Sequence, residues 1–114
     1  MATMRFGSTG DSVLMRNAVF RLMLARAVPM LDNPADKDEL EMDAAIGGIS
    51  FDLLEPGQRH RLARAVHAGF LQLKADVTAG VPLEEPVLPG IQEKLDELIE
   101  FMARHLESTE PPSH

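Results

Sequence analysis

The feature that most constrains the fold is the apolar run between positions 13 and 28, VLMRNAVFRLMLARAV. Read as a helix, this run has no wide polar face, because its three arginines and its asparagine point in four different directions. A helix that is apolar on nearly every side is normally buried on nearly every side. The sequence therefore predicts a central helix over residues 11–28. We expect a second copy of the chain to complete its cover, which gives a homodimer through this helix.

Three further helices are predicted from start and stop signals. Residues 34–46 follow a capping asparagine, begin with a proline and end at two glycines. Residues 56–79 begin with a proline, end before Gly80 and place apolar residues at helical spacing. Residues 90–106 carry a similar apolar stripe after a proline-rich connection over residues 81–89. The expected fold is an all-α bundle of about four helices in one domain, 1–114, with an irregular N-terminus at 1–10 and a flexible tail at 107–114.

The sequence ISFDLL, residues 49–54, allows two interpretations. Its apolar residues alternate as in a short strand, but the only candidate partner strand is residues 81–87. We therefore favour a loop that contains a helical turn begun by Ser50.

Composition excludes several classes of function. The chain has no cysteine, which rules out disulfides, thiol catalysis and cysteine-ligated metals. It has no Trp or Tyr, so aromatic cages and sugar-stacking platforms are also excluded. A net charge of -7 argues against general binding to nucleic acid or to an anionic membrane. We expect a cytoplasmic protein that does not span a membrane; the alternative is a mitochondrial transit peptide, which the arginine-rich residues 1–31 resemble in composition.

Charge alternates in sign along the chain. Residues 1–31 and 56–80 each hold four basic residues and one acid, whereas residues 32–55 and 81–114 hold eight acids each. Neighbouring helices would therefore attract one another in an antiparallel arrangement, although a surface ion pair contributes only about 0–1 kcal/mol. We expect at least one arginine of residues 11–28 to contact carboxylates from residues 36–43 or from the last helix.

Motifs for catalysis or metal binding are not found. The acidic residues between positions 32 and 43 do not match the spacing of an EF-hand, and no histidine completes a di-iron Glu-x-x-His motif. Phosphate-binding loops and nucleophile elbows are absent from the sequence. His105 falls on the apolar side of its helix, where we expect a structural role. We expect no cofactor and no metal, and we favour a protein that is not an enzyme.

The candidate partner-binding surface is one stripe of the helix over residues 56–79, opposite its core face. It consists of His60, Arg64, His67, Leu71 and Lys74. A stripe of this composition suits an anion, a nucleic acid backbone or an acidic partner helix, although it is also typical of an ordinary solvated helix face.

The leading hypothesis is a non-enzymatic protein-protein interaction or regulatory module that acts as a homo-oligomer. One alternative is a small apolar-ligand binding protein with a Met- and Phe-lined pocket between the helices. A weaker alternative is association with nucleic acid through Arg59, Arg61 and Arg64, read as part of a recognition helix.

Overall fold

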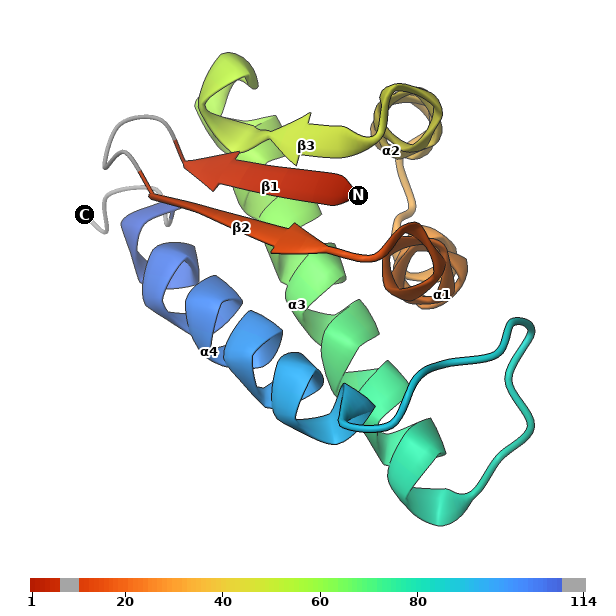
Figure 1. The fold of residues 1–114 in the computed structure, drawn as a ribbon. Helices are drawn as coiled ribbons and strands as arrows, with labels where there is room; N and C mark the ends of the chain where they lie inside the picture. Colours follow the sequence, from red (N-terminus) through yellow and green to blue (C-terminus); the bar gives the residue numbers. More distant parts are fainter. Residues whose placement is uncertain (7–10, 110–114) are drawn as a thin grey trace.

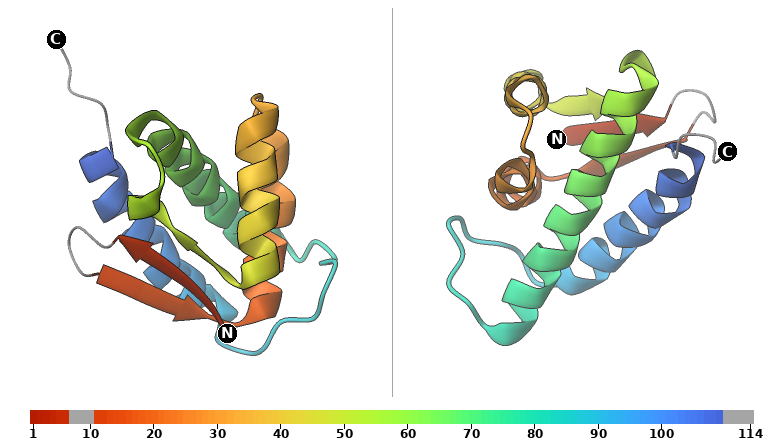
Figure 2. Two further views of the ribbon diagram at one scale, coloured as in Figure 1. Left: turned by 90° about the horizontal axis from the view of Figure 1, so that it is seen from above. Right: turned by 180° about the vertical axis from the view of Figure 1, so that it is seen from behind.

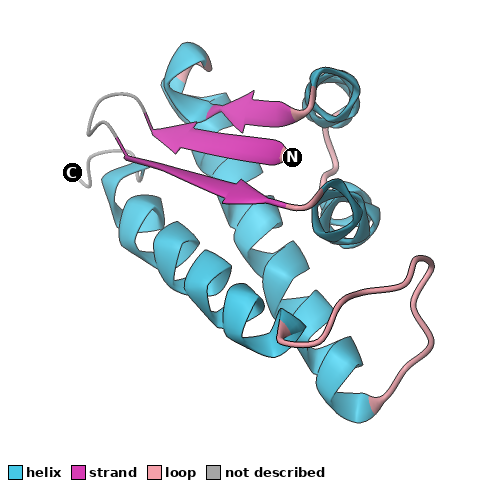
Figure 3. Cartoon of the chain, in the orientation of Figure 1, coloured by secondary structure: helices cyan, strands magenta, loops and turns pink. Residues whose placement is uncertain are grey.

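The computed structural model describes residues 1–6 and 11–109 of the chain, which form a mostly helical structure with a small sheet (Figure 3). The helices are α1 (Asn17–Ala27), α2 (Pro34–Ile46), α3 (Pro56–Ala79) and α4 (Ile91–Thr109). The strands are β1 (Ala2–Phe6), β2 (Asp11–Met15) and β3 (Gly48–Ser50), and two short 3-10 helices are η1 (Val28–Met30) and η2 (Phe51–Leu53). The predicted all-α class is therefore wrong in one respect, because the N-terminal residues build a sheet.

The sheet has the strand order β2-β1-β3, with β1 antiparallel to β2 and parallel to β3. Helices α3 and α4 cover one face of the sheet, and α1 and α2 lie side by side at the end where β2 finishes (Figures 1 and 2). Side chains alternate accordingly along β1, where Ala2, Met4 and Phe6 are buried while Arg5 is exposed. On the other face, which we call the open face, Ser12 and Leu14 of β2 are also exposed.

The predicted helix over residues 11–28 is wrong in its first third. Each residue of Asp11–Met15 is paired with a residue of Ala2–Phe6, which the sequence reasoning assigns to an irregular N-terminus. Residues 13–15 therefore belong to a strand. When the run is read as a helix, their apolar side chains are part of the reason why no wide polar face remains. The helix that remains is amphipathic, with Asn17, Arg21 and Ala25 exposed on one side.

One copy of the chain covers the apolar side of α1. Its buried residues are Val19, Phe20, Leu22, Met23, Leu24 and Ala27. The helix packs against α3 at Gly69, where an added Cβ would lie 2.9 Å from the carbonyl oxygen of Met23. A second copy of the chain is therefore not needed to bury α1, and the burial of this helix gives no support for the predicted homodimer.

The helices with clear end signals form where they are predicted. The side chain of Asn33 accepts a hydrogen bond from the N–H of Ala35 at 2.9 Å, which caps α2. Gly47 and Gly80 end α2 and α3 with φ of 83° and 74°. Residues 81–89 contain no helix or strand, as predicted, and α4 begins at Ile91, one residue after its expected start at residue 90. Helix α4 continues to Thr109, past the expected end at 106, and residues 110–114 of the predicted tail lie outside the described residues.

The segment 48–53 combines both interpretations of the sequence. A helical turn forms at Phe51–Leu53 directly after Ser50, as expected. The preceding Gly48–Ser50 is a strand, and its partner is β1 rather than residues 81–87. Gly48 is required there, because a Cβ at this position would overlap the carbonyl oxygen of Thr3.

Ion pairs connect α1 to the segment between α3 and α4. Arg26 binds Asp76 at 2.8 Å and Glu84 at 3.1 Å, and Arg21 binds Glu85 at 2.6 Å. Arginines of this region therefore do contact carboxylates, as expected. Their partners are wrongly predicted, since they lie at the end of α3 and in residues 81–90 rather than in residues 36–43 or the last helix.

Candidate functional site

The five residues of the predicted partner-binding stripe lie on α3, where two of them are exposed and three are half-buried. Lys74 forms an ion pair with Asp96 of α4, and burial lowers the pKa of His67 below its usual 6.5, so that the ring is neutral at pH 7. Arg64 is exposed and Leu71 is 46% exposed, whereas His60 is half-buried. The stripe is thus a helix face with little net charge and a single exposed leucine.

Arg59 and Arg61 make internal contacts. The guanidinium of Arg59 donates to the carbonyl oxygens of Phe51 and Leu54, each at 2.9 Å. Arg61 donates to both carboxylate oxygens of Asp36, at 2.6 and 3.1 Å. These two side chains therefore position η2 and α2, which leaves Arg64 as the remaining arginine of the three for any contact with nucleic acid.

A hollow of about 460 Å³ lies between α3 and residues 30–36. Its charged groups largely neutralise one another: Arg61 holds Asp36, and exposed Asp32 shares the lining with exposed Arg64. The first amides of α2 are bonded to Asn33. Asp36 and the first amides of α2 therefore already have partners, and a ligand in this hollow would meet the opposite charges of exposed Asp32 and Arg64.

A second hollow, which we call the β2 groove, has a volume of about 320 Å³. It lies where β2 continues into α1, and residues 86–91 form the opposite wall. Met1, Leu14 and Leu88 at this groove are 70%, 53% and 52% exposed. Half-buried Val87 and Ile91 also line it. Exposed apolar side chains gathered from three chain segments around a hollow are typical of a binding surface.

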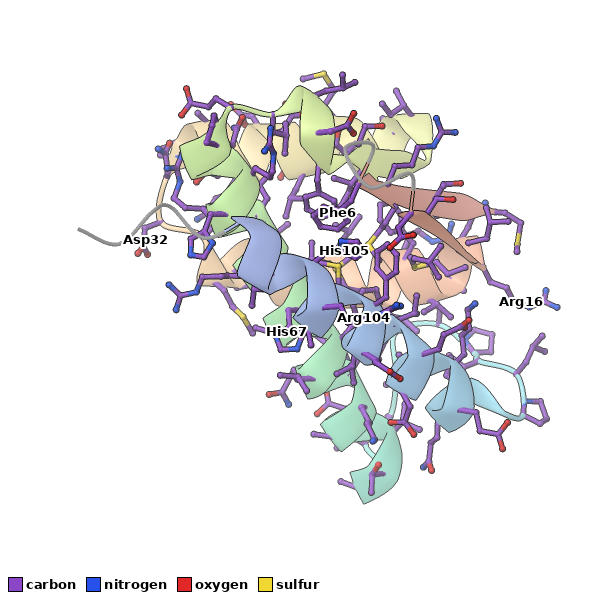
Figure 4. All side chains as sticks on the ribbon, turned by 90° about the vertical axis from the view of Figure 1, so that its left-hand side faces the viewer. Phe6, Arg16, Asp32, His67, Arg104 and His105 are labelled. Carbon is purple, nitrogen blue, oxygen red and sulfur yellow. The ribbon has the colours of Figure 1, made fainter. Side chains whose placement is uncertain are left out.

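The rim of the β2 groove is basic. Arg16, the residue before α1, is exposed and its side chain extends away from the body of the molecule (Figure 4). Lys94 of α4 also lines the groove and pairs with Glu97 at 2.7 Å. Arg5 is exposed on the open face of the sheet, opposite Ser12 of β2. In a chain of net charge -7, exposed Arg5 and Arg16 therefore place two positive charges near β2.

Two carboxyl groups are buried on α2, and their surroundings shift them in opposite directions. Hydrogen bonds from Arg61 lower the pKa of Asp36 below 3.8. Burial, together with the hydrogen bond and charge of Glu39, raises the pKa of Asp43 to about 7. Among the described residues, Asp43 Oδ2 is the buried side-chain oxygen that has no hydrogen-bond partner. The carboxyl group of Asp43 therefore gains or loses its proton near neutral pH in the folded protein.

His105 has the structural position expected from the sequence. Its ring stacks on Phe6 with centroids 4.4 Å apart, and Phe6 stacks in turn on Phe51 at 4.5 Å (Figure 4). Its Nε2 lies 2.9 Å from Oδ2 of Asp11, and the side chain is only 6% exposed. This pair joins α4 to the first residue of β2. A ring so enclosed is poorly placed to act as a base on a substrate.

Sequence reasoning misses the β2 groove because it treats residue 14 as part of a helix. A signal for the hairpin is present: residues 2–6 alternate between apolar and polar, and Gly-Ser-Thr-Gly separates them from residues 11–15. The exposure of Leu14 next to residues 86–91 follows only from the tertiary arrangement, which no local pattern contains.

Within residues 1–6 and 11–109, no cluster of three His, Asp or Glu side chains could hold a metal ion. In the same part of the chain, no helix combines the length and apolar character that crossing a membrane requires. Comparisons with known protein families, with curated proteins and with solved structures find no match for this chain.

Proposed function

We propose that this protein is a non-enzymatic protein-binding module that receives apolar side chains of a partner protein in the β2 groove. The observation that carries this proposal is the exposure of Met1, Leu14 and Leu88 around one hollow. Burying such side chains stabilises a complex by roughly 1.5–3 kcal/mol for each one that becomes fully covered.

A protein partner suits the groove better than a small apolar ligand does. A ligand in a hollow of about 320 Å³ would leave much of these three side chains in water, whereas a protein surface can cover them together. In addition, no phenylalanine lines either described hollow, because Phe6, Phe20, Phe51, Phe70 and Phe101 are buried in the core. The Met- and Phe-lined pocket of the alternative hypothesis therefore gains no support here.

The groove is also a better candidate than the stripe on α3. The stripe offers one apolar side chain, Leu71, and the charge of its Lys74 is balanced by Asp96. A partner on α3 would gain little from covering this face. A second copy of this chain is a weaker candidate partner, because two molecules of net charge -7 repel each other at long range.

Site-specific photo-crosslinking tests the proposal. The full chain carries a photoreactive benzoyl-phenylalanine at position 14, 88 or 71 and is irradiated in the cells that produce it. Positions 14 and 88 report on the groove, and position 71 reports on the α3 stripe as a control of similar exposure. We expect a discrete protein adduct from positions 14 and 88, with the same partner mass from both. Adducts from position 71 alone, or no adduct from positions 14 and 88, would contradict the proposal.

A further inference from the structure

We infer that the partner contributes an extended, acidic segment, which adds to the free edge of β2 as a fourth strand. This inference rests on the proposed function and specifies the chemistry of the occupant. Its basis is the position of the β2 groove at the end of an uncovered sheet edge with a basic rim.

The outer edge of β2 is available for an added strand. β2 lies at one edge of the sheet, and no strand in residues 1–6 and 11–109 pairs with its outer side. Its pairing with β1 is continuous over all five residues, so that no bulge turns the edge away. It also contains no proline or lysine, the residues that commonly protect such an edge.

The opposite edge is less suitable. β3 has only three residues and continues directly into the 3-10 helix η2. It begins with Gly48, which provides no side chain to contact an added strand. β2 is therefore the edge that offers main-chain donors and acceptors over a useful length.

The side chains of β2 alternate between the core and solvent. Met15 of β2 points into the core, whereas Ser12 and Leu14 are exposed. An added strand presents its side chains with the same period of two, so that one of them falls beside Leu14. At that point Leu88 and Ile91 form the opposite wall of the groove. The main chain would supply affinity, and the groove would select an apolar side chain.

The charged groups near the β2 edge favour an acidic segment. The exposed cations near this edge are Arg16 at the groove and Arg5 opposite Ser12, whereas Lys94 is half-buried. The nearby acids already have partners: Asp11 is bonded to His105, and Glu97 to Lys94. An acidic segment therefore matches this edge, while the acidic remainder of the molecule would repel it from other surfaces.

The experiment uses capped seven-residue peptides and the full chain labelled with ¹⁵N. The first peptide alternates Glu and Val, and the second has Lys in place of every Glu. Two further versions of the Glu-Val peptide carry N-methyl groups on alternate amides, one on the odd and one on the even positions. N-methylation removes the donors of a strand without changing its side chains, and one of the two sets must face β2.

We expect the Glu-Val peptide to shift amide signals of residues 11–16 and 87–94. We expect the Lys-Val peptide and at least one N-methylated peptide to bind about tenfold more weakly or worse. Arg16→Glu should weaken binding of the Glu-Val peptide by about tenfold, whereas Arg64→Glu, the same change on α3, should leave it within about twofold.

Equal affinity for both N-methylated peptides and their parent would refute strand addition. Equal affinity for the Glu and Lys peptides, or an unchanged affinity in Arg16→Glu, would refute the acidic segment. Binding by none of these peptides would refute the inference as a whole. The proposed function is separate from these outcomes, because crosslinks from positions 14 and 88 would still show that a protein occupies the groove.

Discussion

At the scale of single residues, α2 shows how the neighbour of a buried carboxyl decides its charge. Asp36 and Asp43 are 1% and 7% exposed on the same helix. Arg61 stabilises the carboxylate of Asp36, whereas Asp43 faces the carboxyl group of Glu39. The two sites therefore make opposite contributions to the pH dependence of stability.

Replacing Asp43 by Asn should stabilise the protein at neutral and alkaline pH. The pKa of Asp43 is about 7 in the folded protein and near 3.8 in the unfolded chain. Between these values the folded state binds the extra proton, so that its stability falls as pH rises from about 4 to 7 and then stays level. We expect Asp43→Asn to raise the free energy of unfolding by up to about 4 kcal/mol more at pH 8 than at pH 4, since one pKa unit corresponds to about 1.4 kcal/mol.

Urea unfolding of both proteins across this pH range measures the difference. Asp38→Asn, an exposed position on the same helix, controls for the loss of one negative charge. Carboxyls with lowered pKa, such as Asp36, lose their stabilising effect as pH falls, but this effect is common to all the variants. A pH-independent gain from Asp43→Asn would contradict a titration of this group near neutrality.

The Asp36–Arg61 pair should respond unequally to removal of its two members. Asp36 has 2% side-chain exposure and Arg61 has 47%. Arg61→Leu leaves a buried carboxylate without its cation, whereas Asp36→Leu leaves an arginine that water can reach. We expect Arg61→Leu to lower the melting temperature at pH 7 more than Asp36→Leu, with the difference disappearing near pH 3, where the unpaired Asp36 is protonated. Calorimetry at both pH values tests this order, and equal losses at pH 7 would refute the asymmetry.

At the scale of elements, the structure separates what local sequence signals predict from what they miss. α2 and α3 are predicted to the residue, because Asn33, Pro34 and Pro56 start them and left-handed glycines end them. β2 is missed because the apolar residues at 13–15 continue into a real helix, and only pairing with β1 decides their conformation. Strand pairing depends on residues outside the local window, so that helical spacing alone gives the wrong element.

The crossing of α1 and α3 depends on a glycine at their contact. A Cβ on Gly69 would lie 2.9 Å from the carbonyl oxygen of Met23 and 3.1 Å from the Cβ of Ala27. Alanine favours a helix over glycine by about 1 kcal/mol, but overpacking at a rigid contact costs about 1–3 kcal/mol. The difference between these two terms predicts that Gly69→Ala destabilises the protein by up to about 2 kcal/mol.

Gly57→Ala is the matched control in the same helix. Its added Cβ would meet the flexible end of Arg61 at 3.2 Å, which can move aside, so that we expect no loss of stability. Denaturant unfolding compares the two variants with the parent. A Gly69→Ala variant as stable as Gly57→Ala would show that α1 and α3 can separate without cost.

At the scale of the whole molecule, the candidate site depends on a segment without secondary structure. Residues 86–90 of this segment, continued by Ile91, form one wall of the β2 groove, and β2 lies at the other. The alternating charge of the chain correctly indicates that oppositely charged segments meet, as Arg21 and Arg26 show. It could not indicate that these contacts position Leu88 opposite Leu14, because that depends on the path of the chain between α3 and α4 (Figure 1).

The ion pairs of α1 should therefore control the shape of the groove more than the stability of the fold. Arg21 binds Glu85, and Arg26 binds Glu84, in the segment that carries Leu88. In Glu84→Gln/Glu85→Gln, the segment loses its charged contacts while the packing of α3 on α4 is untouched. We expect amide hydrogen exchange at residues 83–90 to accelerate by about tenfold or more, with unchanged exchange in the sheet and in α3.

Raising the salt concentration from about 0.05 to 0.5 M should have the same effect on the parent protein, because screening weakens exposed ion pairs. The photo-crosslinking yield at position 88 should fall in parallel, while the yield at position 14, on the opposite wall, should fall less. If exchange instead accelerates together in α1, α3 and residues 83–90, the segment unfolds with the core, and the groove is then as rigid as the fold itself. Slow exchange at residues 83–90 in the double variant would show that Pro82, Pro86 and Pro89, together with the half-buried Leu83 and Val87, hold this wall without the charges.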